Sequence, residues 1–477
     1  MNLVSNAKWN AFSQIFKIGV QLVNMVFLAK IIPPSEYGLM AMALVIVNLG
    51  NLLRDLGTSS AIIKIKEIST SLINTIFWLN VFMGVALMII VCALSPVISS
   101  IYNQPELIYI LISLSIVFPL ASTAAAHLAL LQRESKFKII SAVEITSALI
   151  SLIIAIVAAL NDFGVYSLIL QAISINLISV IAFWKISKWR PNYNKFINKN
   201  DIKSIFAFTS HVSLFNIVNY FSRNADSFII GKYMSAAILG GYNLAYRIML
   251  FPLQSLTFIA SRSLYPILSH HQEDNSKISI IYLNCVFVVL LISAPLMAGL
   301  AVISEPFIHW IFGSQWYITA EVLKWLAPTA ILQSVLSTTG SVFMAKGRTD
   351  ILLRLGILGT ILQVTGFIIG AQYNIDIFVK LYLVTNVLNF FPAMFFVFRT
   401  LDSSLKIFFK KTLPIIISTS IMVLVVWSLK SMVLSNIKSD AALVMILAGS
   451  GGVTYIILMS IFSKDVRTFL LRKLKIT

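Results

Sequence analysis

Apolar runs of membrane-spanning length recur along the whole 477-residue chain and leave little room for another architecture. About 20 apolar residues span a bilayer as an α-helix, and we count about fourteen such runs between short polar turns. They lie approximately at 10–32, 38–60, 72–95, 107–131, 139–160, 164–184, 204–230, 238–264, 278–303, 319–344, 350–371, 377–398, 412–434 and 441–462. Soluble domains carry about 25% charged residues, whereas this chain has 11%. The sequence therefore predicts an all-α integral membrane protein.

The chain has a formal net charge of +18, and the placement of its basic residues indicates membrane topology rather than nucleic-acid binding. Alternate turns hold 24 of the 36 Lys and Arg residues, whereas the intervening turns hold only Lys232, Lys430 and Lys438. Cytoplasmic loops carry such an excess of basic residues, which also face anionic membrane lipids. We therefore expect a multi-pass protein with both termini in the cytoplasm and no nucleic-acid partner.

Two parts of the chain resemble each other when one is shifted by 202 residues. The shift places polar or small residues of similar character on one another: Lys30 on Lys232, Gly38 on Gly240, Ala29 on Gly231, Gln21 on Arg223, and Asn24 on Asp226. Parallel six-helix repeats with a site at their interface are a transporter layout. We predict an N-lobe at 1–184, a cytoplasmic linker at 185–203, a C-lobe at 204–398 facing a central cavity, and two further helices with a basic cytoplasmic tail at 399–477.

Polar and charged residues recur inside the first two apolar runs of each half. Lys17, Gln21 and Asn24 are spaced by four and three residues, which places them on one face of one helix. The other candidates are Arg54 and Asp55 in the second run, Arg223 and Asp226 in the seventh, and Arg247 in the eighth. Ionisable residues inside a membrane are costly, so each is a functional candidate by default.

Cations outnumber anions among these candidates, which favours an anionic solute. Arg is suited to phosphate because its planar guanidinium donates two parallel hydrogen bonds, and the amides are suited to sugar hydroxyls. We therefore expect the substrate to contact Lys17, Gln21, Asn24, Arg54, Arg223 and Arg247. We expect Asp226 or Asp55 to bind H⁺ or Na⁺ and so couple transport to an ion gradient. The alternative is that neighbouring Arg and Asp side chains pair and only lock helices together.

The sequence lacks the signatures of several other functions. It has no Walker A loop, no His, Cys and Asp cluster with metal-ligand spacing, and no visible Ser-His-Asp arrangement. We therefore expect a transporter rather than an enzyme, without a cofactor. His127 is interpreted as a hydrogen-bonded packing residue. Lys232, Glu321 and Lys324 are interpreted as residues near helix ends that reach the lipid headgroups.

Six short segments carry a resemblance to a known family. They are residues 31–38 (IIPPSEYG), 54–57 (RDLG), 102–106 (YNQPE), 223–232 (RNADSFIIGK), 239–245 (LGGYNLA) and 312–316 (FGSQW). In order and spacing the chain resembles the polysaccharide-transporter family, the lipid-linked oligosaccharide flippases of the multidrug/oligosaccharidyl-lipid/polysaccharide exporter superfamily. The resemblance covers essentially the whole chain.

The resemblance implies movement of undecaprenyl-diphosphate-linked oligosaccharide units, for O-antigen or capsule, from the cytoplasmic to the periplasmic leaflet of a bacterial inner membrane. It implies alternating access driven by an ion gradient, with a cationic cavity between two six-helix lobes. A polysaccharide polymerase and a chain-length regulator are the expected partners. A peptidoglycan-precursor flippase, a drug or cation antiporter of the same superfamily, and a non-transporting scaffold of a polysaccharide assembly complex are the alternatives.

Overall fold

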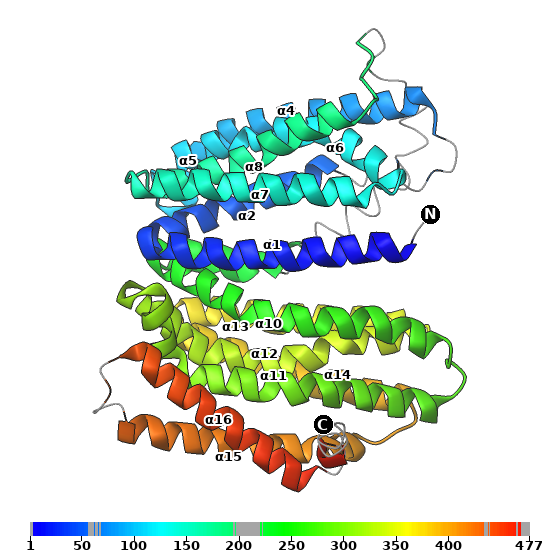
Figure 1. Ribbon diagram of the computed structural model, residues 1–477, viewed down its shortest axis with the longest axis vertical. Helices are drawn as coiled ribbons and strands as arrows, with labels where there is room; N and C mark the ends of the chain where they lie inside the picture. The colour runs from blue at the N-terminus through cyan, green and yellow to red at the C-terminus, as the bar shows by residue number, and fades with distance from the viewer. Residues whose placement is uncertain are drawn as a thin grey trace. The chain divides into compact units, whose positions relative to one another are not determined.

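The structure is a computed structural model that describes residues 3–55, 62, 65, 68–193, 196, 220–221, 223–433, 437, 439–463 and 466–468. Its regular elements are all helical within these ranges. Ten helical segments among the described residues are long and apolar enough to cross a membrane, which confirms the predicted class. The chain divides into two compact units, Met1–Gly240 and Gly241–Thr477 (Figure 1).

The first unit is a bundle of helices, several of which are joined by short turns. Its complete helices are α1 (Leu3–Ile31), α2 (Pro34–Asp55), α4 (Thr70–Tyr102), α5 (Leu107–Ser115), α6 (Val117–Arg133), α7 (Phe137–Leu160) and α8 (Val165–Ile186). Residues 223–233 are also helical. Helix α7 packs against both α1 and α8, and α4 packs against α5 and α6; Figure 1 shows α1 and α7 running side by side. The helices correspond to the first six predicted spans.

One predicted span, 107–131, is made by two helices rather than one. Helix α5 ends at Ser115, Ile116 follows, and α6 begins at Val117. Pro119 explains this break, because proline has no backbone N–H to donate to the carbonyl of Ser115. The two helices together still form one apolar segment of 27 residues, so the predicted crossing is retained with a break within it.

Helices α4 and α6 approach each other through small residues. The Ser122 side chain is fully buried, and its Oγ donates to the carbonyl of Phe118 at 2.8 Å. A Cβ atom added at Gly84 on α4 would lie 2.2 Å from that Oγ. Lipid tails are as apolar as leucine, so helices in membranes associate through close packing of small residues rather than by escaping water. The absence of a side chain at Gly84 therefore sets how close α4 and α6 can lie.

Hydrogen bonds tie three connections together at one end of the first unit. Arg133, at the end of α6, donates through Nη1 to the carbonyls of Ile62 and Ile65 at 2.6 and 2.5 Å. The backbone N–H of Asn192, which follows α8, donates to Oδ1 of Asn74 near the start of α4 at 2.7 Å. The α2–α4 connection, the α6–α7 turn and the stretch after α8 therefore share one end of the bundle.

The second unit contains most of one long helix, α10, and six further α-helices. These elements are α10 (Ala236–Ser269), α11 (Asn275–Phe312), the short 3₁₀ helix η1 (Ser314–Trp316), α12 (Tyr317–Ala345), α13 (Thr349–Ala371), α14 (Ile375–Thr400), α15 (Leu405–Val433) and α16 (Asp440–Phe462). Helix α11 packs against α12, α15 and α16, and α14 packs against α12 and α13. The last two predicted spans therefore form α15 and α16, which join the bundle through α11.

Polar bonds also tie together three turns of the second unit. Lys346, after α12, donates through Nζ to the carbonyl of Gln272 at 2.6 Å and to Oδ1 of Asn275 at 2.7 Å. The amide of Asn275 donates to Oδ2 of Asp402, after α14, at 2.6 Å. The α10–α11, α12–α13 and α14–α15 turns therefore lie at the same end of this unit.

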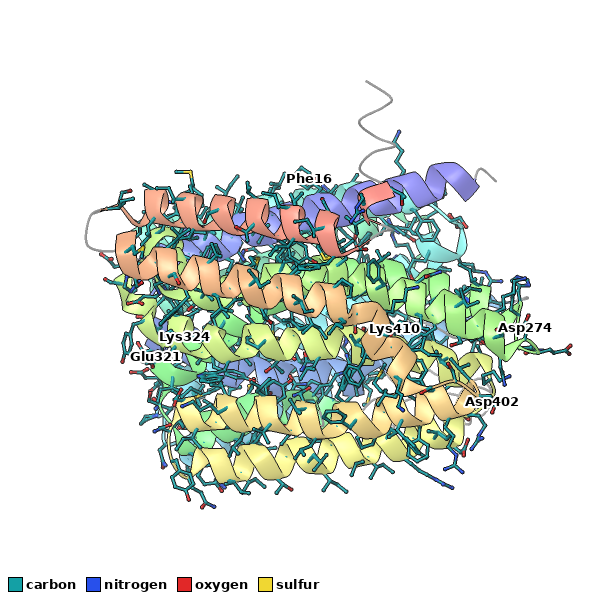
Figure 2. All side chains as sticks on the ribbon, turned by 90° about the horizontal axis from the view of Figure 1, so that it is seen from below. Phe16, Asp274, Glu321, Lys324, Asp402 and Lys410 are labelled. Atoms are coloured by element: carbon teal, nitrogen blue, oxygen red, sulfur yellow. The ribbon has the colours of Figure 1, made fainter. Side chains whose placement is uncertain are left out.

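Charged side chains mark both ends of the second unit. Figure 2 shows Asp274 and Asp402 at one end of the helices, and Glu321 and Lys324 at the other. Glu321 and Lys324 lie in the first turns of α12, and both are exposed. This placement near a helix end agrees with the interpretation that they reach the lipid headgroups.

The two compact units and the two predicted lobes are defined by different criteria. Contacts assign residues up to 240 to the first unit, whereas the internal repeat assigns 204–398 to the C-lobe. Most of the predicted span 204–230 lies outside the described residues. The lobe boundaries at 184, 204 and 398 therefore stay a prediction.

We expect Gly84→Leu to destabilise the protein, because the new side chain would overlap Ser122 and force α4 and α6 apart. Overpacking of this kind costs about 1–3 kcal/mol. Gly356→Leu on α13 is the matched control, since nothing lies within 4 Å of a Cβ built there. Thermal unfolding of detergent-purified protein should show a lower midpoint for Gly84→Leu alone; equal midpoints for the two variants would contradict the close approach at Gly84.

Candidate functional site

The predicted polar stripe of α1 is partly engaged in helix packing. Gln21 is exposed, whereas Asn24 is half-buried. Asn24 and Gln171 on α8 form a reciprocal amide pair, in which Nε2 of Gln171 donates to Oδ1 of Asn24 at 3.1 Å and Nδ2 of Asn24 donates back at 3.4 Å. The side chain of Lys17 lies outside the described part of the structure. Asn24 therefore joins two helices and stays a predicted substrate contact.

Arg54 and Asp55 end α2. The Arg54 side chain is half-buried and lies in the last turn, where the negative end of the helix dipole favours a cation. The side chain of Asp55 lies outside the described residues. Their pairing, and their separate roles with substrate and ion, stay predictions.

Arg223 and Asp226 share a helical turn but differ in burial. The Arg223 side chain is exposed, whereas Asp226 is 6% exposed, and no other Asp, Glu, Lys or Arg side chain is as buried among the described residues. Oδ1 of Asp226 accepts the backbone N–H of Ser227 at 2.6 Å. A carboxyl group buried in a membrane segment is costly, so Asp226 is the carboxylate that the structure marks most clearly as a functional candidate.

The other end of the same helix agrees with the interpretation of Lys232. Its side chain is exposed, and its Nζ lies 5.3 Å from the centroid of the Tyr233 ring. A cation over an aromatic face at a helix end is typical of a residue at the membrane interface.

Arg247 lies on α10 in the second unit and is exposed. Just before it, the rings of Tyr242 and Tyr246 stack with centroids 6.0 Å apart, and the buried Tyr242 forms a T-shaped contact with Phe378 on α14 at 5.9 Å. The other seven predicted site residues belong to the first unit. A shared cavity for all eight residues stays a prediction.

Two residues that sequence reasoning missed connect helices beside the predicted site. Gln171 is the amide partner of Asn24, and the sequence signal was a single Gln in the apolar run 164–184. Tyr220 donates through its hydroxyl to the carbonyl of Val45 on α2 at 2.5 Å. A polar residue in an apolar run needs a partner, but the identity of the partner depends on how the helices pack.

His127 on α6 packs among aromatic rings. It is fully buried, with ring centroids at 4.7 Å from Trp184, 5.4 Å from Trp189 and 6.2 Å from Phe77. Neither of its ring nitrogens has a hydrogen-bond partner in the part of the chain that the structure describes. The expected packing role is confirmed, whereas none of the described residues supplies the expected hydrogen bond.

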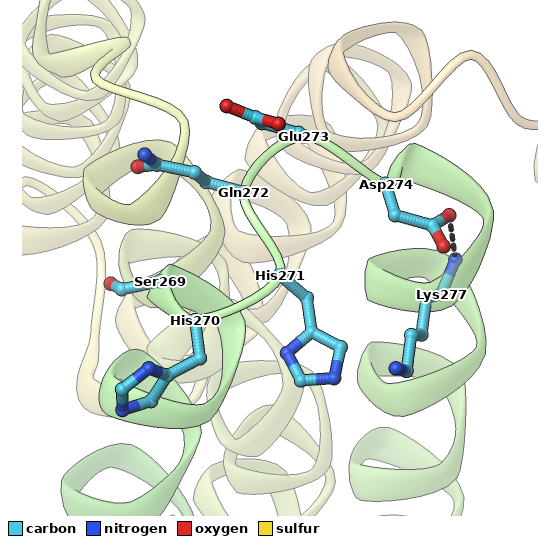
Figure 3. A pocket seen from close by; sticks show the side chains of 7 residues that line it. All are labelled: Ser269, His270, His271, Gln272, Glu273, Asp274 and Lys277. Carbon is cyan, nitrogen blue, oxygen red and sulfur yellow. Dashed lines mark hydrogen bonds between the residues drawn. The ribbon is translucent and has the colours of Figure 1, made fainter.

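A pocket of about 390 Å³ lies at the α10–α11 turn (Figure 3). It is lined by Ser269, His270, His271, Gln272, Glu273, Asp274 and Lys277. Figure 3 shows His270 and His271 pointing in different directions, and Oδ1 of Asp274 caps α11 by accepting the Lys277 backbone N–H at 2.9 Å. The described residues contain no group of three or more His, Cys, Asp or Glu side chains arranged to hold a metal ion. This pocket includes none of the predicted site residues.

Comparison with known sequences gives consistent matches over most of the chain. The model of the family described as "Polysaccharide biosynthesis protein" matches residues 27–321. The lipopolysaccharide biosynthesis protein WzxC of Escherichia coli (strain K12) is 30% identical over 356 residues, which cover 74% of this chain and 72% of that protein. The teichuronic acid biosynthesis protein TuaB of Bacillus subtilis (strain 168) is 28% identical over 351 residues, 73% and 72% of the two chains.

A solved structure shares the fold. The lipid II flippase MurJ in an inward closed conformation matches with a TM-score of 0.75 over 97% of this chain and 99% of that chain, at 16% identity. The apolar helices and these matches define a multi-pass integral membrane protein. The chain belongs to the family described as "Polysaccharide biosynthesis protein", which confirms the family resemblance inferred from its motifs.

We expect the Asn24 and Gln171 side chains to contribute to stability as a pair. Asn24→Ala and Gln171→Ala should each lower the thermal unfolding midpoint, and the double variant should cost no more than about the larger single effect. Interhelical side-chain hydrogen bonds in membranes contribute about 0.6 kcal/mol on average, and a double-mutant cycle isolates that coupling. Gln21→Ala is the control, because Gln21 is exposed on the same helix. Strictly additive effects of the two substitutions would contradict the pairing.

Proposed function

We propose that this protein flips lipid-diphosphate-linked oligosaccharide units, carried on undecaprenol, from the cytoplasmic to the periplasmic leaflet for the synthesis of a surface polysaccharide. The observation that carries this proposal is family membership together with 30% identity to a lipopolysaccharide biosynthesis protein over 74% of the chain. The lipid anchor stays in the bilayer while the diphosphate and sugars cross through a polar path.

The proposed topology has fourteen spans in two six-helix lobes plus two C-terminal helices, with both termini in the cytoplasm of a bacterial cell. Described helices lie along the predicted spans, apart from most of 204–230, which supports the count. In each unit, hydrogen bonds hold the turns that contain Arg133 or Lys346 at a single end. Basic residues gathered at one end of a bundle support a cytoplasmic assignment for that end.

The proposed mechanism is alternating access with cationic residues as ligands for the diphosphate. Lys17 and Arg54 receive the phosphate oxygens first, and Arg223 and Arg247 take them over as the lobes rock. The exposure of Arg223 and Arg247 supports this role, because a ligand can reach an exposed guanidinium and accept two parallel hydrogen bonds from it. Gln21 and Asn24 contact sugar hydroxyls. A transporter changes state only through a difference in affinity between its states.

Asp226 is the proposed coupling residue, with Asp55 as the second carboxylate. Asp226 is buried to 6% exposure beside the exposed Arg223, so the free energy of binding H⁺ or Na⁺ there differs between a dry and a hydrated state. Ion binding at one side of the membrane and release at the other would then bias the conformational cycle.

The proposed partners are the enzymes that use the flipped units: a polysaccharide polymerase and a chain-length regulator. The names of two relatives refer to the biosynthesis of lipopolysaccharide and of teichuronic acid. A peptidoglycan-precursor flippase is a second candidate by fold, since MurJ is similar over nearly the whole chain. At 16% identity that similarity concerns the fold alone, and the family match favours polysaccharide units.

The proposal predicts that Arg223→Ala abolishes transport, because it removes a phosphate ligand without changing a buried contact. Complementation of a bacterial strain that lacks its own oligosaccharide flippase measures this as restored surface polysaccharide at matched membrane expression. Arg223→Lys should restore part of the activity, since it keeps the charge and loses the bidentate geometry. Lys232→Ala, at the exposed helix end, is the matched control. Full activity of Arg223→Ala would exclude Arg223 from the substrate site.

Asp226→Asn tests the coupling role separately, because it keeps side-chain volume and removes the titratable group. We expect loss of gradient-driven flipping in proteoliposomes, with retained binding of the lipid-linked substrate to the purified protein. Glu321→Gln, at a helix end, should behave like the wild type. Gradient-driven flipping at the wild-type rate in Asp226→Asn would exclude Asp226 as the coupling residue.

A further inference from the structure

Two glycines of the first unit bring helices α2 and α10 into direct backbone contact. A Cβ atom built on Gly38 would lie 1.7 Å from the carbonyl oxygen of Ala236, and one built on Gly240 would lie 2.0 Å from the carbonyl oxygen of Pro34. Contacts under 3.0 Å are essentially never made by a real Cβ atom. The close approach of these two helices therefore requires glycine at both positions.

The contact is reciprocal. Gly38 is the fifth residue of α2 and Gly240 is the fifth residue of α10, and each meets the first residue of the other helix. The repeat shift of 202 residues aligns Pro34 with Ala236 and Gly38 with Gly240. The same pair of repeat positions therefore forms both halves of the contact, as in an isologous interface around a two-fold axis.

The contact between the repeats continues along α2 from this crossing. Gly231, in the helix before α10, lies where a Cβ atom would be 3.3 Å from Cγ of Met42 and 2.7 Å from the ring of Tyr102. Further along, the Tyr220 hydroxyl donates to the carbonyl of Val45. Residues 34–45 of α2 cover about 16 Å at 1.5 Å per residue, so the second repeat contacts α2 over about half of a membrane thickness.

The crossing itself contains no side chain that would have to move for it to open. It consists of glycine Cα atoms against carbonyl oxygens, a weak contact that recurs where helices cross closely. Larger side chains would interlock and resist separation, whereas small residues let two helices meet and part with little rearrangement. Such a contact suits a boundary that forms and breaks in every cycle.

We propose that Gly38 and Gly240 are positioning residues for the transport cycle: their reciprocal crossing closes the transport path at the end where α1 meets α2, and separation of α2 from α10 opens it. This inference rests on alternating access in the proposed function. In the proposed topology this end is periplasmic.

Cysteine accessibility tests the closure without any transport assay. The reporter is Met42→Cys, in a chain that also carries Cys92→Ala and Cys285→Ala. Met42 is fully buried one helical turn beyond Gly38. In detergent-purified protein the reporter should react slowly with a maleimide. Adding Gly38→Leu should accelerate the reaction by about tenfold or more, the population shift expected when a side chain overpacks a contact. Gly240→Leu should have the same effect.

The reciprocal geometry also predicts how the double variant behaves in the same assay. Once either substitution has opened the crossing, the second has no contact left to disrupt, so Gly38→Leu with Gly240→Leu should label about as fast as each single variant. Gly19→Leu on α1 is the matched control, since nothing lies within 4 Å of a Cβ built at Gly19, and its labelling should match that of the parent chain.

A second reporter separates opening from unfolding. Leu114 on α5 is fully buried in the same unit, and Leu114→Cys should stay slow in every variant. The proposal is overturned if Gly38→Leu leaves the Met42→Cys rate unchanged, or accelerates both reporters equally. It is also overturned if neither Gly38→Leu nor the smaller Gly38→Ala yields folded protein, because the crossing would then be permanent packing. Failure of the complementation assay would affect the proposed flippase function and leave these rates unchanged.

Discussion

The absence of water inside a bilayer is the constraint on which the rest of this structure depends. Every backbone N–H and C=O group in the membrane must find a partner in the protein, which restricts spanning segments to helices. Hydroxyl side chains follow the same rule: Ser95 donates to the carbonyl of Cys92 and Ser122 to that of Phe118, at 2.8 Å each. Amides cannot always do this within one helix, so Asn24 and Gln171 satisfy each other across two helices.

The same constraint separates two kinds of contact along the bundle axis. At the ends of the helices, long polar side chains such as Arg133 and Lys346 bind several backbone carbonyls or amides of neighbouring turns and hold those turns together. Between the ends, small residues such as Gly84 and Ser122 let the backbones approach. Both kinds of contact are compatible with the proposed transport cycle. The polar bonds keep the turns of each unit together, and the small residues let helices pack closely.

Hydropathy and charge placement predicted the helical membrane class and nearly every described helix, because both depend on composition along one segment. The sequence did not predict features that depend on packing between distant segments. Asn24 and Gln171 are 147 residues apart, and the aromatic surroundings of His127 come from α4, α8 and the stretch after it. The break before α6 had a local signal, Pro119, in a run otherwise apolar enough to span. Within the predicted site, the position of Asp226 inside an apolar run correctly indicated a buried carboxyl group. The same criterion also selected Arg223, whose side chain is exposed.

The equivalence of Pro34 with Ala236, and of Gly38 with Gly240, has a consequence for the origin of the chain. The predicted parallel internal repeat implies an origin by gene duplication and fusion. Before fusion, two copies of one six-helix protein would have met across a true two-fold axis, and a single codon would have specified both glycines of the crossing. Any substitution of that codon would have altered both halves of the contact at once. After fusion, the first residues of the two helices would have been free to diverge into Pro34 and Ala236. Both glycines still meet in the crossing.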